Sequence, residues 1–253
     1  MKNFSEILIR QKRAISLNHY GVDNLDSFET ATDEIIRNFY RDLKVFAHKD
    51  EEFEKKIIEN YNKTQTYETA EQSELIDEQL DCQRQIGYIN GYLDSLTEMK
   101  VVYLFKSIEL IIKDFIKTAY LNIDVKSFFK WENIKEFFKG HGIDISLIDG
   151  YQQCVELKKI NNCIKHNGIL TQEIQSITEF ANSQYLKHEQ LELFYTRINN
   201  KVKLFCFYLK EKIKEDLYTF SDERLNTLAT DFHERMDDKT ILMFLDKLSK
   251  KLE

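Results

Sequence analysis

Apolar residues recur every three or four positions along most of the chain, the spacing of amphipathic helices. The clearest pattern covers residues 187–217, and we expect this helix to be the longest. Its apolar seam should face the core: Leu191, Phe194, Ile198, Val202, Phe205, Leu209 and Ile213. Similar patterns predict further helices over residues 4–17, 26–47, 51–61, 69–99, 101–121, 127–139, 151–165, 172–182, 221–236 and 239–252.

The composition favours long helices over any other structure. The 253 residues include no proline and only seven glycines, whereas average usage would give about 13 and 18. Since these two residues are the ones that interrupt helices, we expect an all-α fold. The predicted organisation is an N-terminal helical region (1–98), a helical bundle (99–219) and C-terminal helices (220–253).

Two features of the sequence indicate a cytoplasmic protein outside the membrane. The four cysteines form no CxxC pair or zinc-like spacing, so buried free thiols are expected. The N-terminus does not resemble a signal peptide, and the most apolar stretch, residues 101–121, contains too many charges to span a membrane. Gly87 and Gly91 lie four residues apart on one helix face, which favours close packing of another helix.

Charge is unevenly distributed along the chain. The net charge is −7, and residues 1–98, with 12 basic and 20 acidic side chains, contribute −8. Residues 99–168, with 11 basic and 8 acidic side chains, contribute +3, and the rest contribute −2. A general nucleic-acid binder would be basic overall. The balance therefore allows a local RNA site in the middle segment and suggests that the acidic N-terminal region packs on the bundle or docks a protein partner.

Polar side chains gather where the helix over residues 151–165 ends. Asp149 fits an N-cap, and Asn167 with Gly168 fits a left-handed stop. The basic segment thus contains a helix end with candidate chemistry.

The apolar and polar residues of this helix fall on separate faces. At 100° per residue, Ile160 and Ile164 lie within about 60° of Leu157, whereas Asn162 and His166 lie about 140° and 180° away. His166 should therefore point off the core, in the last turn, where the helix dipole favours an imidazolium. A lone histidine is more often a solvated surface residue, but Asn162 and Lys158, which lies about 100° from Leu157 on the same face, favour a site.

The order Asn161-Asn162-x3-His166 resembles the signature of the HEPN superfamily, helical-bundle proteins of which many are metal-independent endoribonucleases. That signature runs arginine, a polar residue (often asparagine), three variable residues, and histidine near a helix end. His166 takes the histidine position and Asn162 the polar position, while Asn161 stands where the family has arginine. In active relatives that cation binds and stabilises the scissile phosphate.

The surroundings of the motif extend the resemblance over residues 99–219. The predicted helix 101–121, with Glu109 in its middle, is similar to the helix that precedes the motif in the family. The linking segment, with Trp131 and a Gly-Ile-Asp sequence, is similar as well. The resemblance implies a HEPN-like bundle that forms a homodimer, with its active groove between two subunits.

The resemblance also implies a reaction in which the 2′-hydroxyl of RNA attacks the neighbouring phosphate without a metal or other cofactor. His166 would move the proton, and Asn162 would orient it or bind phosphate. Because Asn161 stands in place of the usual arginine, the positive charge would have to come from neighbouring lysines, which lack the bidentate fork of arginine. These lysines are Lys158, Lys159 and Lys165.

Three functions remain open from the sequence. The first is a HEPN-like endoribonuclease or toxin of a bacterial antiviral defence or toxin–antitoxin system. The second is a non-catalytic HEPN-like scaffold that binds a protein partner, which the missing arginine favours. The third is a structural helical protein in which His166 only marks a helix stop. Tyr151 and Val155 precede His166 on its own face, which favours a homodimer that covers them.

Overall fold

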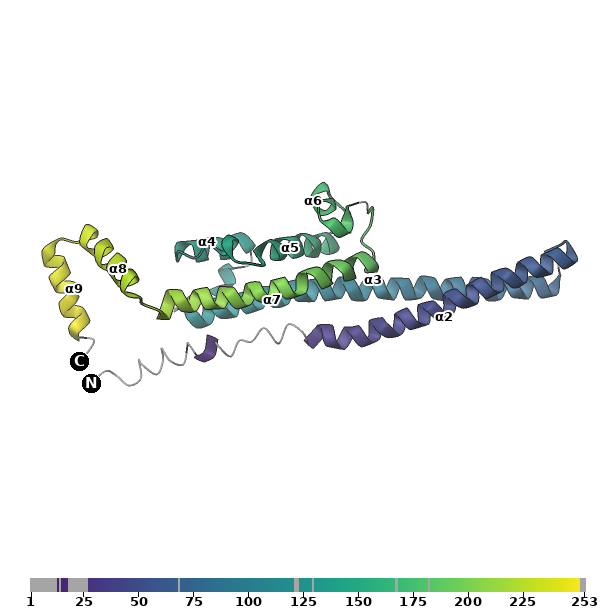
Figure 1. The fold of residues 1–253 in the computed structure, drawn as a ribbon, viewed down its shortest axis with the longest axis horizontal. Coiled ribbons are helices and arrows are strands. Elements are labelled where there is room, and N and C mark those ends of the chain that lie inside the picture. The colour runs from purple at the N-terminus through teal and green to yellow at the C-terminus, as the bar shows by residue number, and fades with distance from the viewer. Residues whose placement is uncertain are drawn as a thin grey trace. The chain divides into compact units, whose positions relative to one another are not determined.

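The fold is built from helices of very different lengths (Figure 1). The computed structural model describes residues 13, 15–17, 27–67, 69–120, 123–128, 130–166, 168–181 and 183–250, and these contain no strand. The all-α helical prediction is confirmed. The chain divides into two compact units. The first unit includes Ile108–Tyr151 and Lys203–Glu253, and the second unit comprises Asp23–Ser107 and Gln152–Val202.

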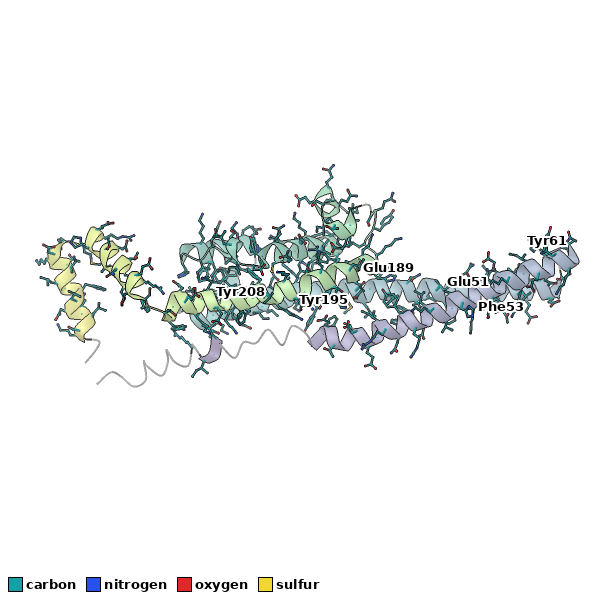
Figure 2. The ribbon with its side chains drawn as sticks, in the orientation of Figure 1. Glu51, Phe53, Tyr61, Glu189, Tyr195 and Tyr208 are labelled. Atoms are coloured by element: carbon teal, nitrogen blue, oxygen red, sulfur yellow. The ribbon has the colours of Figure 1, made fainter. Side chains whose placement is uncertain are left out.

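A long helical hairpin forms much of the second unit. It pairs α2 (Ser27–Thr64) with α3 (Ala70–Ala119), of which residues 70–107 belong to this unit. Ile36 of α2 packs with Ile89 and Leu93 of α3 in its buried core. At the turn, Tyr61 (labelled in Figure 2) stacks on Tyr67 with ring centroids 4.3 Å apart.

The turn between α2 and α3 uses no glycine. Gln65 takes a positive φ of 57° immediately after α2, and its backbone N–H donates to the Tyr61 carbonyl at 2.7 Å. Its side-chain amide donates to the Asn62 carbonyl at 3.0 Å. These bonds hold a left-handed conformation that glutamine rarely adopts.

Both helices of the hairpin are longer than the sequence pattern predicts. The expected break between residues 47 and 51 is absent, because α2 continues through that charged segment to Thr64. The expected break between residues 99 and 101 is absent too, since α3 is a single helix of 50 residues. The prediction that residues 187–217 form the longest helix is therefore wrong. Charged residues interrupt an apolar stripe without interrupting a helix, because their side chains leave the backbone hydrogen bonds intact.

Lys100 shows how α3 carries a charge through its buried part. The Lys100 side chain is 3% exposed, and its Nζ lies 2.9 Å from Asp33 Oδ1 and 3.1 Å from Glu192 Oε1. The ammonium also lies 4.5 Å from the ring centroid of Tyr195, which Figure 2 labels on α7. A buried charge is stable only when it is paired, and here two carboxylates from α2 and α7 pair it.

Helix α7 (His188–Tyr218) supplies the core seam that the sequence predicts. All seven seam residues are buried: Leu191, Phe194, Ile198, Val202, Phe205, Leu209 and Ile213. His188, the first residue of α7, donates its backbone N–H to Asp94 Oδ1 at 2.9 Å. Its imidazole Nδ1 lies 3.0 Å from the same oxygen. This acidic side chain of α3 therefore caps α7 and fixes its start in the second unit.

The first unit contains α4 (Trp131–Gly140) and the helices that follow the end of α7. Trp131, Ile134 and Phe138 of α4 are buried, and the ring centroids of Trp131 and Tyr151 are 6.4 Å apart. The short helices η2 (Val125–Ser127) and η3 (Ile145–Leu147) lie on either side of α4 in sequence. Helices α8 (Asp222–Arg235) and α9 (Asp238–Lys250) complete the unit.

The predicted start of α8 is confirmed. Ser221 is its N-cap, and the serine hydroxyl accepts from the backbone N–H of Arg224 at 3.3 Å. The Arg224 side chain donates to the carbonyls of Glu215 and Thr219 at 2.7 and 2.8 Å. The guanidinium therefore caps the last carbonyls of α7 and ties α8 to it.

The remaining predictions have mixed outcomes. The helix expected over residues 4–17 lies largely outside the described residues. The four cysteines are free and buried, as expected. Burial raises the pKa of Cys206 to about 12. Among the described helices, none is long and apolar enough to cross a bilayer. The predicted boundary between residues 98 and 99 falls inside α3, and the division at 219 and 220 falls between α7 and α8.

Candidate functional site

Helix α5 (Tyr151–Lys165) has the bounds that the sequence predicts and carries the candidate site. It ends where expected, because Gly168 has a φ of 66° and donates its N–H to the Cys163 carbonyl at 2.9 Å. Asn167, the other half of the predicted stop, lies outside the described residues. His166 is hydrogen-bonded through its backbone N–H to the Asn162 carbonyl at 3.0 Å, so it stands in the last turn.

His166 and Asn162 open onto a shallow pocket beside the end of α5. Both side chains are exposed, as their angular positions predict. The pocket has a volume of about 350 Å³ and belongs entirely to the second unit. Its lining combines α5 with the segment that leads into α6 (Gln172–Gln175): Lys159, Asn162, Cys163, His166, Ile169, Thr171, Glu173 and Ile174. The pocket therefore brings together two of the three predicted catalytic residues.

The third predicted residue, Asn161, lies elsewhere. Its side chain is 1% exposed and is buried with Leu157 and Ile160 on the core face of α5. Its amide nitrogen donates to Asn162 Oδ1 at 3.3 Å, while its own Oδ1 has no hydrogen-bond donor among the described residues. The position at which the HEPN signature has arginine therefore faces the interior of this protein.

The three predicted substrate-binding lysines do not act as a group. Lys159 lines the pocket, and its Nζ lies 3.5 Å from Glu173 Oε2. Lys158 is half-buried and Lys165 is exposed, and neither lines the pocket. Of the three, only Lys159 therefore lines the pocket with His166, and the Glu173 carboxylate balances its charge.

The surroundings of the thiol in the pocket wall favour its protonated form. Cys163 is buried, and its Sγ donates to the Ile169 carbonyl at 3.3 Å. Burial, and secondarily the negative charge of Glu98, raise the pKa of this thiol. Because the thiolate is the reactive form, a raised pKa leaves the side chain inert near neutral pH.

The arginine that contacts α5 is bound by two carboxylates. Arg197 of α7 donates to Glu179 at 2.6 Å and 3.0 Å and to Glu156 at 2.9 Å. The hydrogen bond to Glu179 is the largest cause that raises the pKa of Arg197. Burial alone would raise the pKa of Glu179, but the bonds and charge of Arg197 outweigh it and hold the pKa below 4.5. Arg197 therefore serves as a structural clamp.

Part of the apolar α5 face that was expected to bind a second subunit is already covered by this chain. Tyr151 packs its ring 6.4 Å from Trp131 and 6.0 Å from Phe205, measured between ring centroids. Val155 is half-buried. The homodimer through this face stays a prediction, with less apolar surface to support it than the sequence indicates.

Sequence reasoning missed the Arg197 clamp and the Lys100 pairing. Both join residues far apart in the chain, and no local spacing marks them. Among the described residues, no group of three His, Cys, Asp or Glu side chains is placed to hold a metal ion.

Comparison of the chain with protein-family models, with curated proteins and with solved structures finds no match in any of the three. The resemblance to the HEPN superfamily therefore rests on the sequence alone, on the motif around His166 and the segments that precede it.

Proposed function

We propose that this chain is a HEPN-like helical module that binds a protein partner and does not cleave RNA. The observation that carries the proposal is the position of Asn161, which is 1% exposed and faces the core in place of the signature arginine. A cation must stand at the scissile phosphate to stabilise the charge that develops during cleavage. This position supplies none.

The charges around the pocket do not replace the missing cation. Lys159 is paired with Glu173 at 3.5 Å, and Arg197 is held by Glu156 and Glu179. Removing one preorganised donor of this kind typically costs about 10²–10³-fold in rate. An exposed imidazole in a pocket of balanced charge is a weak basis for catalysis.

Helices α8 and α9 support the protein-binding part of the proposal. Neither helix has a buried residue among those described, although Phe232 and Phe244 pack with ring centroids 5.0 Å apart. Helices of 14 and 13 residues are marginally stable alone. The exposed Leu245 and Leu248 of α9 therefore favour a partner that covers them.

The charge of these helices favours a protein over RNA as that partner. Helix α8 has four acidic and two basic side chains, and α9 has two acidic and three basic ones. The sum is −1, whereas RNA-binding helices carry a clear positive excess. An apolar groove on a partner protein therefore suits the α8–α9 pair better than RNA does.

RNA cleavage is tested with the purified full chain, an RNA panel and excess chelator. Wild type and His166→Ala should both leave the RNA at the background rate. Cleavage by wild type that falls a hundredfold or more in His166→Ala, the usual scale for a general acid–base group, would overturn the proposal. Asn162→Ala serves as the companion variant, because Asn162 shares the pocket.

A metal-independent endoribonuclease is the second candidate function. What favours it is that His166, Asn162 and Lys159 line one open pocket. In this case Lys159 would have to leave Glu173 to reach the phosphate. Glu173→Gln should then increase cleavage, whereas a partner-binding module would show no cleavage with either side chain.

A further inference from the structure

The outer face of the α2–α3 hairpin carries an aromatic ridge beside a flat groove. Tyr88 and Tyr92 of α3 are four residues apart and therefore form one ridge on the helix. The adjacent row of exposed positions on the same helix, also spaced four residues apart, consists of Gly87, Gly91 and Ser95. No atom lies within 4 Å of the place where a Cβ would stand on either glycine. The packing that these glycines favour is thus not supplied by the residues that the structure describes.

The exposed apolar area on this face is large for a single helix. Tyr88, Tyr92 and Tyr103 are 58%, 54% and 39% exposed. With roughly 150–250 Å² per aromatic side chain, these three alone expose about 300 Å². Met99 and Ile35, also exposed, extend the patch. Contiguous apolar patches of this size mark interaction surfaces more often than solvated ones.

Contacts with α2 hold the tyrosines in place. Tyr92 packs on Phe39 with ring centroids 5.4 Å apart, and Tyr103 stacks on Phe28 at 4.5 Å. A ridge whose side chains are already ordered loses little conformational entropy when a partner covers it. The face is therefore preformed for binding.

The chemistry of the face selects its partner. The exposed residues of α3 from Gly87 to Tyr103 on this side are uncharged, although residues 1–98 have a net charge of −8. The acidic residues beside the glycine row, Asp94 and Glu98, are half-buried, and Asp94 is bound to His188. A nucleic acid or a basic protein would be bound through a cluster of exposed charges, which this face does not have. In so acidic a region, a face with little exposed charge can meet its own copy with little repulsion.

The ridge and the groove are also complementary to each other. The Tyr88–Tyr92 ridge follows an i, i+4 row, and the groove of Gly87, Gly91 and Ser95 follows the adjacent i, i+4 row. Two such helices pack ridge into groove at a crossing angle of about −50°. A two-fold axis through the middle of the face sets each ridge in the groove of the other copy.

We propose that the α3 face formed by Gly87, Tyr88, Gly91, Tyr92, Ser95 and Met99 binds the same face of a second copy of this chain. The surface is separate from the His166 pocket, and the inference does not depend on whether that pocket is catalytic. A standard interface covers about 800 Å² on each partner. The tyrosines supply its centre, and the polar residues around them supply its rim.

The first test is sedimentation of the full chain at micromolar concentration. Wild type should have about twice the monomer mass of 30.3 kDa. Tyr92→Glu places a charge at the centre of the interface in both copies and should weaken the dimer by roughly a hundredfold, as for interface hot spots. Ile58→Glu is the matched control, since Ile58 is 53% exposed but lies near the C-terminal end of α2, outside the proposed face.

A second variant separates close helix packing from simple apolar adhesion. Among the described residues no atom lies within 4 Å of a Cβ placed on Gly91, and leucine raises helix propensity, so Gly91→Leu should fold as wild type does. The leucine fills the groove, so the dimer should be lost although the face becomes more apolar. Circular dichroism checks that each variant is as helical as wild type.

Three results would overturn the inference. They are a monomeric wild type at tens of micromolar, a Tyr92→Glu variant that dimerises as tightly as Ile58→Glu, and a Gly91→Leu variant that dimerises as well as wild type. Val155→Glu distinguishes the faces, because it should leave this dimer intact and would break one formed over the His166 pocket.

Discussion

Asn161 and Asn162 are adjacent on α5, yet Asn161 is buried in the core and Asn162 lines the solvent-open pocket. The same amide side chain therefore has two environments one residue apart. This contrast provides a matched pair of substitutions on one helix.

Asn161→Arg should destabilise the protein instead of restoring a catalytic cation. Among the described residues the Asn161 side chain bonds only to Asn162, which carries no charge to balance a guanidinium, and arginine is larger than asparagine. We expect the free energy of unfolding to fall by about 3 kcal/mol or more, the scale of an unpaired buried charge. Denaturant titration measures the loss.

Asn162→Arg is the control for that measurement. Its side chain points into solvent, so stability should change by about 0.5 kcal/mol or less. Equal stability of Asn161→Arg and Asn162→Arg would show that position 161 can present a cation after all, and would reopen the ribonuclease function.

Lys100 is expected to be the most sensitive charged residue of the second unit. Lys100→Met keeps the length of the side chain but leaves Asp33 and Glu192 without their shared cation. Both carboxylates keep some contact with water, so we expect a loss of about 2–4 kcal/mol, near the lower end for a broken buried pair. Lys106→Met, on the exposed face of α3, should change stability by about 0.5 kcal/mol or less.

Glu179 should make stability dependent on pH in the acid range. Its folded pKa is below the ordinary value of 4.5, so the unfolded chain takes up the proton first as pH falls. The contribution is complete above pH 4.5 and is lost as pH falls through the lower folded pKa. Glu179→Gln should remove this part of the pH dependence.

The pH experiment compares unfolding midpoints of wild type, Glu179→Gln and Glu173→Gln from pH 7 to pH 3. Glu173 is the control because its side chain is exposed and its ion pair is long, at 3.5 Å. If the unfolding midpoint of Glu179→Gln falls with decreasing pH as much as that of wild type, the Arg197 clamp does not contribute to the stability of the fold.

Leu245 should be essential for binding the partner protein but not for folding. Leu245→Glu changes an exposed side chain of α9, so the thermal midpoint should stay within a few degrees of wild type. Quantitative affinity purification from the source organism should recover one partner protein with wild type. The amount of that protein recovered should fall at least tenfold with Leu245→Glu. Lys247→Gln changes the net charge by the same −1 and should keep the protein bound, and a protein retained by Leu245→Glu would contradict the role of α9.

Local patterns were sufficient to predict part of the fold and site. The bounds of α5 and the buried seam of α7 follow from helical periodicity and from the glycine at position 168. The exposure of His166 follows from the same periodicity. These features depend only on neighbours in sequence, so a single chain reveals them.

Other features depend on contacts between distant residues. Lys100 looks like a break in the apolar pattern, but Asp33 and Glu192 accommodate it within a continuous helix. Asn161 lies near the edge of the predicted stripe, and it is buried because the core face of α5 is wide enough to include Cys154 and Cys163 as well. Neither outcome can be deduced from helix geometry alone.

Trp131 gives this chain a built-in optical probe of one half of its structure. It is the sole tryptophan, and it is buried within the first unit. Fluorescence excited where tyrosine does not absorb therefore reports the loss of that unit alone, while circular dichroism reports helix loss throughout the protein. Coincident melting curves mean that the two units unfold cooperatively, and separated curves assign a melting temperature to each.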